Sequence, residues 1–409
     1  MHHVISSGVL HRLARFALPL LSSTIARVGA GNGRPVRGGV AEQGPLLVWT
    51  MDRLGDVVRA TVALRLLARR HPHSPLVVVA PARAATALAN NPHVAELIVI
   101  RRHYDIREHL AVAARLRRRR WAGGVLLEVD PNWAMLGQLL CTLMRVPELV
   151  LLDLGQPIAR GARPLQLDDS GSWLRQFQRL AAALGAEPDA TVRPELFPSE
   201  QARKAVAVRL RARGIDPAGP MFLLHPGGGA HTVSRQWPAS AFGALVTQLR
   251  QRWPYPVLVS GLAHERRQAA QLARAAAAPV HDLTGELSLS ELIALISLNT
   301  LCIMNDTGPL HLAFALGRPA VAVLGPTGAE TVGVPPDAAV ATTRLPCQPC
   351  AFLTGWQRCA NPIQWECLTA LTPQMVLAAV EQQVAHWQMD VGAAPGLAGV
   401  GAGSGPSRC

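Results

Sequence analysis

Residues 305–327, NDTGPLHLAFALGRPAVAVLGPT, carry the clearest signal of the fold. It has the pattern of a strand end, a tight turn, a short helix, an apolar strand and a second turn. Pro309 suits the first turn of that helix, Gly317 suits the position just past its end, and Pro319 prevents its continuation. A strand followed by a helix and another apolar strand predicts parallel strands with crossover helices.

The same alternation recurs on both sides of this stretch. Apolar strands are expected near residues 46–50, 75–81, 96–100, 123–129 and 147–153, and again near 221–225, 255–261, 279–283, 300–305 and 320–326. Helical patterns separate most of them. The sequence therefore predicts an α/β fold with two Rossmann-like doubly wound domains facing a central cleft, where the carboxyl ends of the strands would meet a ligand.

Changes in composition divide the chain into five segments. The expected segments are a basic leader and linker (1–44), an N-terminal domain (45–200), a C-terminal domain (201–372), a C-terminal helix (373–389) and a disordered Gly/Ala/Pro-rich tail (390–409). The apolar run of the leader is too short to span a membrane and is interrupted by Arg12, Arg15 and Arg27. It has the features of a weak signal peptide or of an amphipathic segment that lies on a membrane.

The charge balance indicates an anionic partner. Forty Lys and Arg residues against 27 Asp and Glu give a net charge of +13. That excess would suit a nucleic acid, a phosphorylated metabolite or an anionic membrane surface. Only 4% of the residues are aromatic, which leaves little surface for stacking nucleotide bases, so a nucleic-acid partner is not expected. The run Arg117–Arg120 fits a solvated helix end.

The turn at residues 306–308 is a candidate anion site. Asp306 or Thr307 could simply cap the helix that follows. Gly308, however, leaves backbone N–H groups exposed at a helix N-terminus, which attracts anions. His311, in the first turn, could donate to the same anion or could be a partly buried helix histidine.

Two further candidates follow strands of the C-terminal domain. The strand ending at His225 leads into Gly227 and Gly228, which would let a ligand approach the backbone. Arg235, just before Trp-Pro, could bind phosphate with two hydrogen bonds or could lie on a flexible surface loop. Glu265 opens a helix at a strand end, where it could bind ribose hydroxyls or complement the helix dipole.

In the N-terminal domain, Asp56 follows the first strand in the sequence MDRLGDVVRA. A carboxylate at the start of this helix could cap it. It would also face the cleft, where it could act as a general base on a hydroxyl.

Taken together in this order, these motifs resemble glycosyltransferase family nine, the ADP-heptose:lipopolysaccharide heptosyltransferases. The matching stretches are DRLGDVV, NPHVAELIVI, HPGGGA with SRQWP, SGLAHE, DLTGELSLSELIALI and the stretch 305–327, and they span residues 46 to about 387. The resemblance implies a GT-B fold whose C-terminal helix crosses back to the N-terminal domain. It also implies an inverting transfer from a nucleotide-activated heptose.

The resemblance also implies roles for the candidate residues. Asp56 would deprotonate the acceptor hydroxyl, and Arg235, which replaces the lysine usual in the family, would stabilise the leaving diphosphate. Donor binding is expected from eight residues, namely His225, Gly227, Gly228, Glu265, Asp306, Thr307, Gly308 and His311. No Asp-x-Asp motif occurs, which argues against a metal-dependent GT-A enzyme, so neither a catalytic metal nor a cofactor is expected.

Four cysteines lie close together in the loop 347–367. Cys347, Cys350, Cys359 and Cys367 have the spacing C-x2-C-x8-C-x7-C. This spacing fits a small structural zinc site, and it equally fits reduced or redox-labile thiols.

The sequence therefore predicts an inverting, metal-independent glycosyltransferase. The expected partners are a nucleotide-sugar donor, with ADP-heptose favoured, and an anionic lipid-linked glycan acceptor such as lipopolysaccharide core. The expected location is the cytoplasm, with peripheral contact to the inner membrane. One alternative is a non-catalytic sugar-nucleotide-binding or scaffold protein of glycan assembly. A nicotinamide-dependent oxidoreductase is disfavoured because no G-x-G-x-x-G lies between a strand and a helix.

Overall fold

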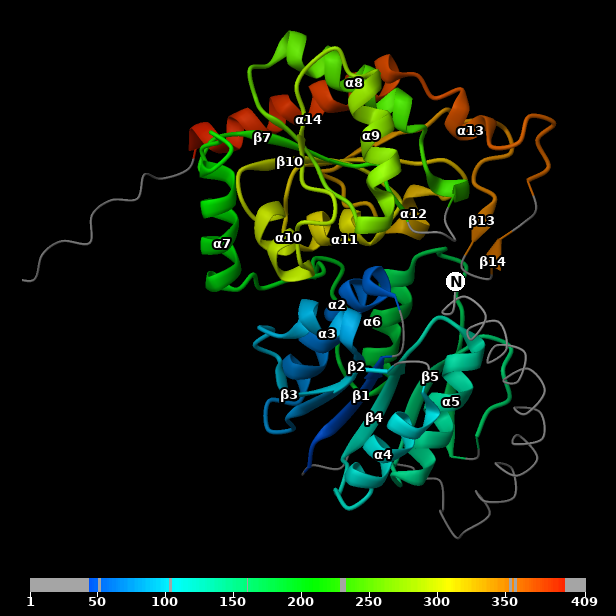
Figure 1. Cartoon of the computed structure of the whole chain (residues 1–409). Coiled ribbons are helices and arrows are strands. Elements are labelled where there is room, and N and C mark those ends of the chain that lie inside the picture. The colour runs from blue at the N-terminus through cyan, green and yellow to red at the C-terminus, as the bar shows by residue number, and fades with distance from the viewer. Residues whose placement is uncertain are drawn as a thin grey trace, which may run out of the picture.

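A computed structural model describes residues 44–50, 53–102, 105–159, 161–228, 233–352, 355–356 and 359–393. Within these residues the chain forms two α/β domains, one above the other in Figure 1. The leader and linker up to residue 43, and the tail from residue 394, lie outside the described residues.

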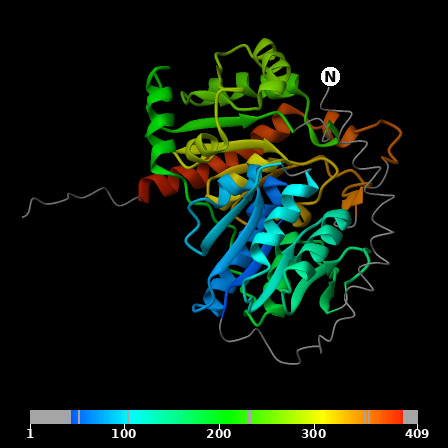
Figure 2. The same ribbon diagram turned by 60° about the horizontal axis from the view of Figure 1, so that its bottom comes forward.

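The first domain is built on a parallel sheet of six described strands in the order β3-β2-β1-β4-β5-β6. Its strands are β1 (Leu46–Thr50), β2 (Leu76–Pro81), β3 (Val94–Ile100), β4 (Gly123–Leu127), β5 (Leu149–Asp153) and β6 (Ala162–Gln166). Its helices are α2 (Leu54–Arg70), α3 (Ala82–Leu88), α4 (Ile106–Leu116), α5 (Pro131–Leu143) and α6 (Trp173–Ala183). Figure 2, which brings the lower end of the molecule forward, shows these helices against the sheet.

Alternating apolar side chains give this first sheet two buried faces. Leu46 and Val48 of β1 pack with α2, α3 and α6, whereas Leu47 and Trp49 pack with α4 and α5. A strand buried on both faces is apolar at every position, which explains why LLVWT reads as a continuous apolar run.

The second domain repeats the same topology. Its described strands have the order β12-β11-β10-β7-β8-β9, which is again 3-2-1-4-5-6 when they are counted from β7. The strands are β7 (Met221–His225), β8 (Val257–Val259), β9 (His281–Asp282), β10 (Thr300–Asn305), β11 (Ala320–Val323) and β12 (Ala339–Ala341). The helices are α7 (Glu200–Arg211), α8 (Ala239–Arg252), α9 (Arg266–Ala275), α10 (Leu289–Ile296), α11 (Gly308–Ala315), α12 (Ala329–Val332), α13 (Glu366–Thr369) and α14 (Pro373–Ala393). Short 3₁₀ turns lie at η1 (Val233–Arg235) and η2 (Ala263–Glu265), and a small hairpin joins β13 (Ala351–Phe352) to β14 (Gly355–Trp356).

The predicted α/β architecture of two doubly wound domains is confirmed. The order of the strands also indicates where a ligand would bind. In each sheet the strand order reverses beside the central strand, between β1 and β4 in the first sheet and between β7 and β10 in the second. Ligands of open α/β sheets bind at the carboxyl ends of the strands at this point. Asp56 follows β1, Pro226 and the glycines follow β7, and Asp306 follows β10.

The C-terminal helix differs from the expectation that it crosses back to the first domain. In the structure α14 packs against α8 and against β10, β11 and β12 of the second sheet, and it lies at the far side of that domain in Figure 1. Val376, Val380, Val384 and Trp387 form one buried stripe along this helix. The indole N–H of Trp387 donates to Asn299 Oδ1 at 2.8 Å, so burial of this stripe fixes α14 to its own domain. The helix also continues to residue 393, four residues beyond the expected end.

No helix among the described residues has the length and apolarity needed to cross a membrane.

Close packing of α8 on α9 gives a stability prediction. A Cβ at Gly243 of α8 would lie 2.4 Å from the carbonyl oxygen of Leu272 in α9. We expect Gly243→Ala to lower the free energy of unfolding by about 1–3 kcal/mol, although alanine favours a helix. Urea unfolding measures the change.

Gly137→Ala is the matched control for this prediction. Gly137 also lies in a helix, α5, but a Cβ there would meet the end of the Leu126 side chain at 2.6 Å, and that side chain can turn. We expect a smaller loss of stability. A Gly243→Ala protein as stable as the wild type would show that α8 and α9 are not packed in this way.

Candidate active site

The two domains meet at the amino ends of α2 and α11, which pack against each other. A Cβ at Gly55 would lie 2.6 Å from Cδ2 of His311, and a Cβ at Gly308 would lie 3.2 Å from Cδ2 of Leu54. These two glycines therefore allow the helix ends to approach closely. The positive ends of two helix dipoles face the same region, which favours an anionic ligand there.

Neither helix end is capped by a side chain. The N-cap of α2 is Arg53, and Asp56 lies in the first turn, so Asp56 does not have the capping role that was its alternative interpretation. The N-cap of α11 is Thr307, whose hydroxyl donates to the Asn305 carbonyl at 3.2 Å and does not cap the helix. Among the described residues, therefore, no capping side chain accepts from the backbone N–H groups in the first turn of α11. These N–H groups remain available to bind an anion.

Asp306 connects several elements of the second domain and is almost fully buried. Its Oδ2 accepts from Arg235 Nη1 at 3.1 Å and from Thr327 Oγ1 at 2.9 Å, and its Oδ1 lies 3.9 Å from His311 Nε2. The carboxylate thus ties η1, α11 and the loop after β11 together at one point. From the sequence, Asp306 could have capped α11. In the structure Thr307 is the N-cap residue, and the Asp306 carboxylate accepts hydrogen bonds from Arg235 and Thr327 instead.

The neighbouring Asn305 holds the same loops in place. Its Oδ1 accepts from the Trp237 backbone N–H at 3.1 Å, and its Nδ2 donates to the Pro226 carbonyl at 2.9 Å. The loops after β7 and β10 are therefore fixed to each other, which positions Arg235 beside Asp306.

Asp56 reaches this cluster from the first domain. Its carboxylate forms a hydrogen-bonded ion pair with Arg59, one turn further along α2. Arg59 also donates from Nη1 to the carbonyl of Thr331 in the second domain at 3.0 Å. Sequence reasoning missed Arg59, although its spacing of three residues from Asp56 places both on one side of the helix.

The electrostatics of the cluster follow from its buried arginines. Burial lowers the pKa of Arg235, opposed by Asp306 and assisted by the positive charges of Arg53 and Arg59. The pKa of His311 is lowered well below its ordinary value, first by burial and then by Arg59 and Arg235. The imidazole is therefore neutral at physiological pH and can still donate one hydrogen bond.

The remaining predicted donor-binding residues lie at the ends of β7 and β8. Glu265 is buried, and its carboxylate accepts from the backbone N–H groups of Gly228 at 2.9 Å and Leu262 at 2.7 Å. A Cβ at Gly227 would overlap this carboxylate, so a larger residue there would displace Glu265 from its hydrogen bonds. His225 Nδ1 lies 3.1 Å from Ser260 Oγ, and burial lowers the pKa of its imidazole. The structure thus brings Glu265 and the glycines together.

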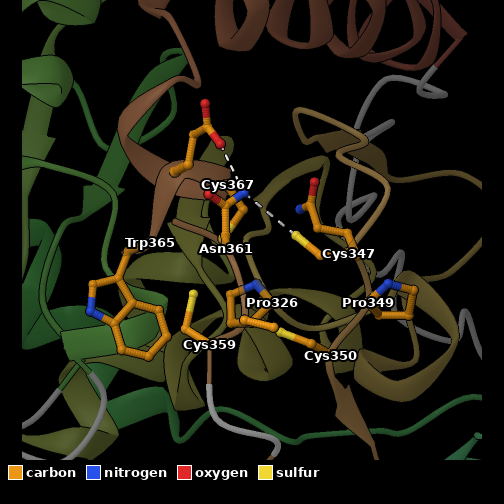
Figure 3. A pocket seen from close by; sticks show the side chains of 11 residues that line it. Pro326, Cys347, Pro349, Cys350, Cys359, Asn361, Trp365 and Cys367 are labelled. Carbon is orange, nitrogen blue, oxygen red and sulfur yellow. Dashed lines mark hydrogen bonds between the residues drawn. The ribbon is translucent and has the colours of Figure 1, made fainter. Parts of the chain in front are cut away.

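The four loop cysteines surround a separate small cavity of about 160 Å³ (Figure 3). All four are free thiols, and Asn361 Nδ2 lies 3.8 Å from Cys347 Sγ. Burial and the neighbouring cysteines raise the pKa of Cys350, and they raise that of Cys367 to about 11. Among the described residues no three His, Cys, Asp or Glu side chains are placed so as to hold a metal ion. The structure therefore gathers the four described thiols around one cavity, without placing three of them as ligands of a single metal ion.

Comparison with known proteins finds similarity to one family. The profile of glycosyltransferase family 9 (heptosyltransferase) matches residues 175–355, which include Arg235, Glu265, Asp306 and His311. Lipopolysaccharide heptosyltransferase 2 of Salmonella typhimurium is 24% identical over 300 residues, which cover 70% of this chain and 84% of that protein.

The chain is similar to the heptosyltransferases of glycosyltransferase family 9.

Solved structures show the same fold in other proteins. The ADP-heptose lipopolysaccharide heptosyltransferase II of Escherichia coli is 22% identical, with a TM-score of 0.66, and the similarity covers 84% of this chain and 99% of that one. A family 9 glycosyltransferase of Veillonella parvula is 19% identical, with a TM-score of 0.71, covering 85% and 99% respectively. The expected GT-B fold of this chain is therefore confirmed.

The buried, neutral His311 gives a prediction for the pH dependence of stability. Its pKa is lower in the folded than in the unfolded protein, so below about pH 6.5 the unfolded chain binds a proton that the folded chain does not. Stability present above this pH is lost as the pH falls. We expect His311→Gln to reduce the slope of unfolding free energy against pH by up to about 1.4 kcal/mol per pH unit between pH 6.5 and 5.

Urea unfolding at several pH values measures this slope. His386→Gln removes an imidazole from the exposed face of α14 and controls for the loss of any histidine. An unchanged slope in His311→Gln would contradict the proposed burial of a neutral imidazole.

Proposed function

We propose that this glycosyltransferase moves a heptosyl residue from ADP-heptose to lipopolysaccharide core or a related lipid-linked glycan, with inversion at the anomeric carbon. The observation that supports it best is the meeting of Asp56, from the first domain, with Arg235, Asp306 and the α11 N-terminus, from the second. The heptosyl donor and acceptor are those of the similar proteins named above. The reaction would take place in the cytoplasm, at the surface of the inner membrane.

In this proposal Asp56 is the general base. The acceptor hydroxyl oxygen attacks the anomeric carbon from the side opposite the diphosphate and forms the new glycosidic bond. The bond between that carbon and the diphosphate oxygen breaks, and the hydroxyl proton passes to the Asp56 carboxylate. A single displacement of this kind inverts the anomeric configuration. Arg59 orients the base through their ion pair.

The departing ADP needs its negative charge stabilised, and the residues of the second domain can supply this. Arg235 is held in place by Asp306 and stays charged as a guanidinium. The uncapped first turn of α11 offers backbone N–H groups, and the neutral imidazole of His311 offers one more donor. Because these groups are cationic or dipolar, we propose that the transfer needs no metal ion. Glu265 and the glycines after β7 would line the nucleoside side of the donor.

Replacing the base should separate catalysis from binding. We expect Asp56→Asn to lower kcat by about 10²–10⁴-fold while ADP still raises the melting temperature. The measurement is the rate of transfer from ADP-heptose to lipopolysaccharide core, monitored by the release of ADP. Asp216→Asn, the same change at an exposed position of the second domain, should leave the rate unchanged. A wild-type protein that binds ADP but transfers nothing would support the non-catalytic scaffold alternative instead.

The donor nucleotide can be identified by ligand-induced stabilisation. Saturating ADP, at about a hundred times its dissociation constant, should add about 2.7 kcal/mol to the unfolding free energy, whereas UDP, GDP, CDP and NAD should add little. We expect Arg235→Ala to abolish the ADP shift and Arg235→Lys to keep part of it, since lysine keeps the charge but not the planar fork. Transfer should persist in the presence of a chelator such as EDTA. Stabilisation by UDP in place of ADP would overturn the donor assignment.

A further inference from the structure

A cavity lined by arginines lies in the first domain, outside the candidate active site. Its volume is about 1020 Å³, and it is formed between the end of α4, the segment before β4 and the loop before β5. Six of the residues that line it carry a guanidinium group, namely Arg115, Arg117, Arg118, Arg119, Arg120 and Arg145. The other lining residues are Ala114, Trp121 and Pro147, so no carboxylate lines this cavity among the described residues.

One of the six arginines holds the cavity wall in shape. Arg119 forms two hydrogen bonds with Glu96, at 2.6 and 3.0 Å, and its guanidinium lies 5.9 Å from the centre of the Trp121 ring. The hydrogen bond from Arg119 lowers the pKa of Glu96, so this carboxylate stays ionised and committed to its partner. Arg119 is therefore a structural residue that anchors the run of arginines to β3.

The other arginines of the run have no such partner. In the described part of the chain no ion pair joins Arg117, Arg118, Arg120 or Arg145 to a carboxylate, and all four are exposed. The nearby Glu148 lies 3.7 Å from Arg163 and does not line the cavity. Several like charges held together without counter-charges create a positive potential that attracts a polyanion.

Exposed apolar side chains lie on the two helices that end near the basic cavity. Ile106 and Leu110 of α4 are each 42% exposed, and Leu143 at the end of α5 is 43% exposed. Ile106, Leu110 and Ala114 are spaced four residues apart, so they form one stripe along α4 that leads to the cavity. Basic residues at the end of an exposed apolar stripe are typical of surfaces that bind anionic membranes.

The cavity lies at the edge of the sheet opposite the candidate active site. Arg120 precedes β4 and Arg145 precedes β5, whereas Asp56 follows the parallel strand β1. The two sites are therefore separated by about one strand length, roughly 16 Å for five residues. A ligand in this cavity would leave the donor side uncovered.

We propose that this surface, made of the arginine cavity and the apolar stripe on α4, docks the protein onto the phosphate headgroups of an anionic membrane. A membrane fits better than a nucleic acid, because exposed leucine and isoleucine can enter the acyl boundary but do not stack on bases. This proposal rests on the proposed function at one point, because a lipid-linked acceptor lies in a membrane and the enzyme must reach it there. Binding to vesicles is measured without any transfer.

The test is co-sedimentation of the full chain with lipid vesicles. We expect binding to phosphatidylcholine vesicles that contain about a third phosphatidylglycerol, weak binding to pure phosphatidylcholine, and loss of binding as salt is raised. Each arginine near an anionic surface contributes about fivefold to the partition coefficient. The variant Arg117→Gln/Arg118→Gln/Arg120→Gln should therefore lose binding on the order of a hundredfold.

A charge-matched variant separates this surface from general basicity. Arg203→Gln/Lys204→Gln/Arg211→Gln removes the same number of charges from exposed positions of α7 in the second domain. It should keep most of the vesicle binding. Leu110→Ser should weaken the binding that remains at high salt, because that part depends on apolar contact.

Three outcomes would overturn the proposal. They are equal losses in the two triple variants, no difference between anionic and neutral vesicles, or stronger binding of short RNA than of anionic vesicles at the same salt. Transfer to a water-soluble, de-acylated acceptor distinguishes this failure from failure of the proposed function. The Arg117→Gln/Arg118→Gln/Arg120→Gln variant should keep that activity, and its melting temperature shows whether it folds.

Discussion

The close contact between the amino ends of α2 and α11 is the constraint on which the candidate active site depends. Gly55 lies against the His311 ring and Gly308 lies against Leu54, so a larger residue at either position would have to displace a side chain of the other domain. Each helix follows a strand at the point where the strand order of its sheet reverses. The same contact therefore brings the carboxyl ends of two sheets together and directs two helix dipoles at one region.

Within this region the charges are arranged as two linked pairs. Asp56 is paired with Arg59 in the first domain, and Asp306 is paired with Arg235 in the second. Arg59 also reaches a carbonyl of the second domain, so the ion pair that orients the proposed base also connects the domains. Burial among these cations keeps His311 neutral. An arriving diphosphate would meet guanidinium groups and uncapped helix ends, which suits a leaving group that carries negative charge.

The positive charge of the chain has two different roles in the structure. Arg59 and Arg235 are largely buried and paired, so their charges serve the candidate active site. The arginines that line the cavity before β4 and β5 are mostly exposed and lack acidic partners. They lie at the other end of the strands. The net charge of +13 is therefore not spread evenly over the surface. The two groups of arginines lie in different surroundings and are suited to different ligands.

The α/β fold, its division into two doubly wound domains and the positions of Asp56 and Asp306 at strand ends could be predicted from the sequence. These features depend on local patterns, since a strand buried on both faces must be apolar throughout and a turn must supply its own glycine or proline. The sequence did not reveal β6, an exposed edge strand whose residues ARPLQ show no apolar alternation. Other features could be found only in the folded structure. There α14 packs on the second domain, Arg59 donates to the Thr331 carbonyl, and Asp306 accepts from Arg235 and Thr327. These contacts join residues far apart in the chain, and no local pattern of hydrophobicity or charge specifies which distant partner a buried side chain will meet.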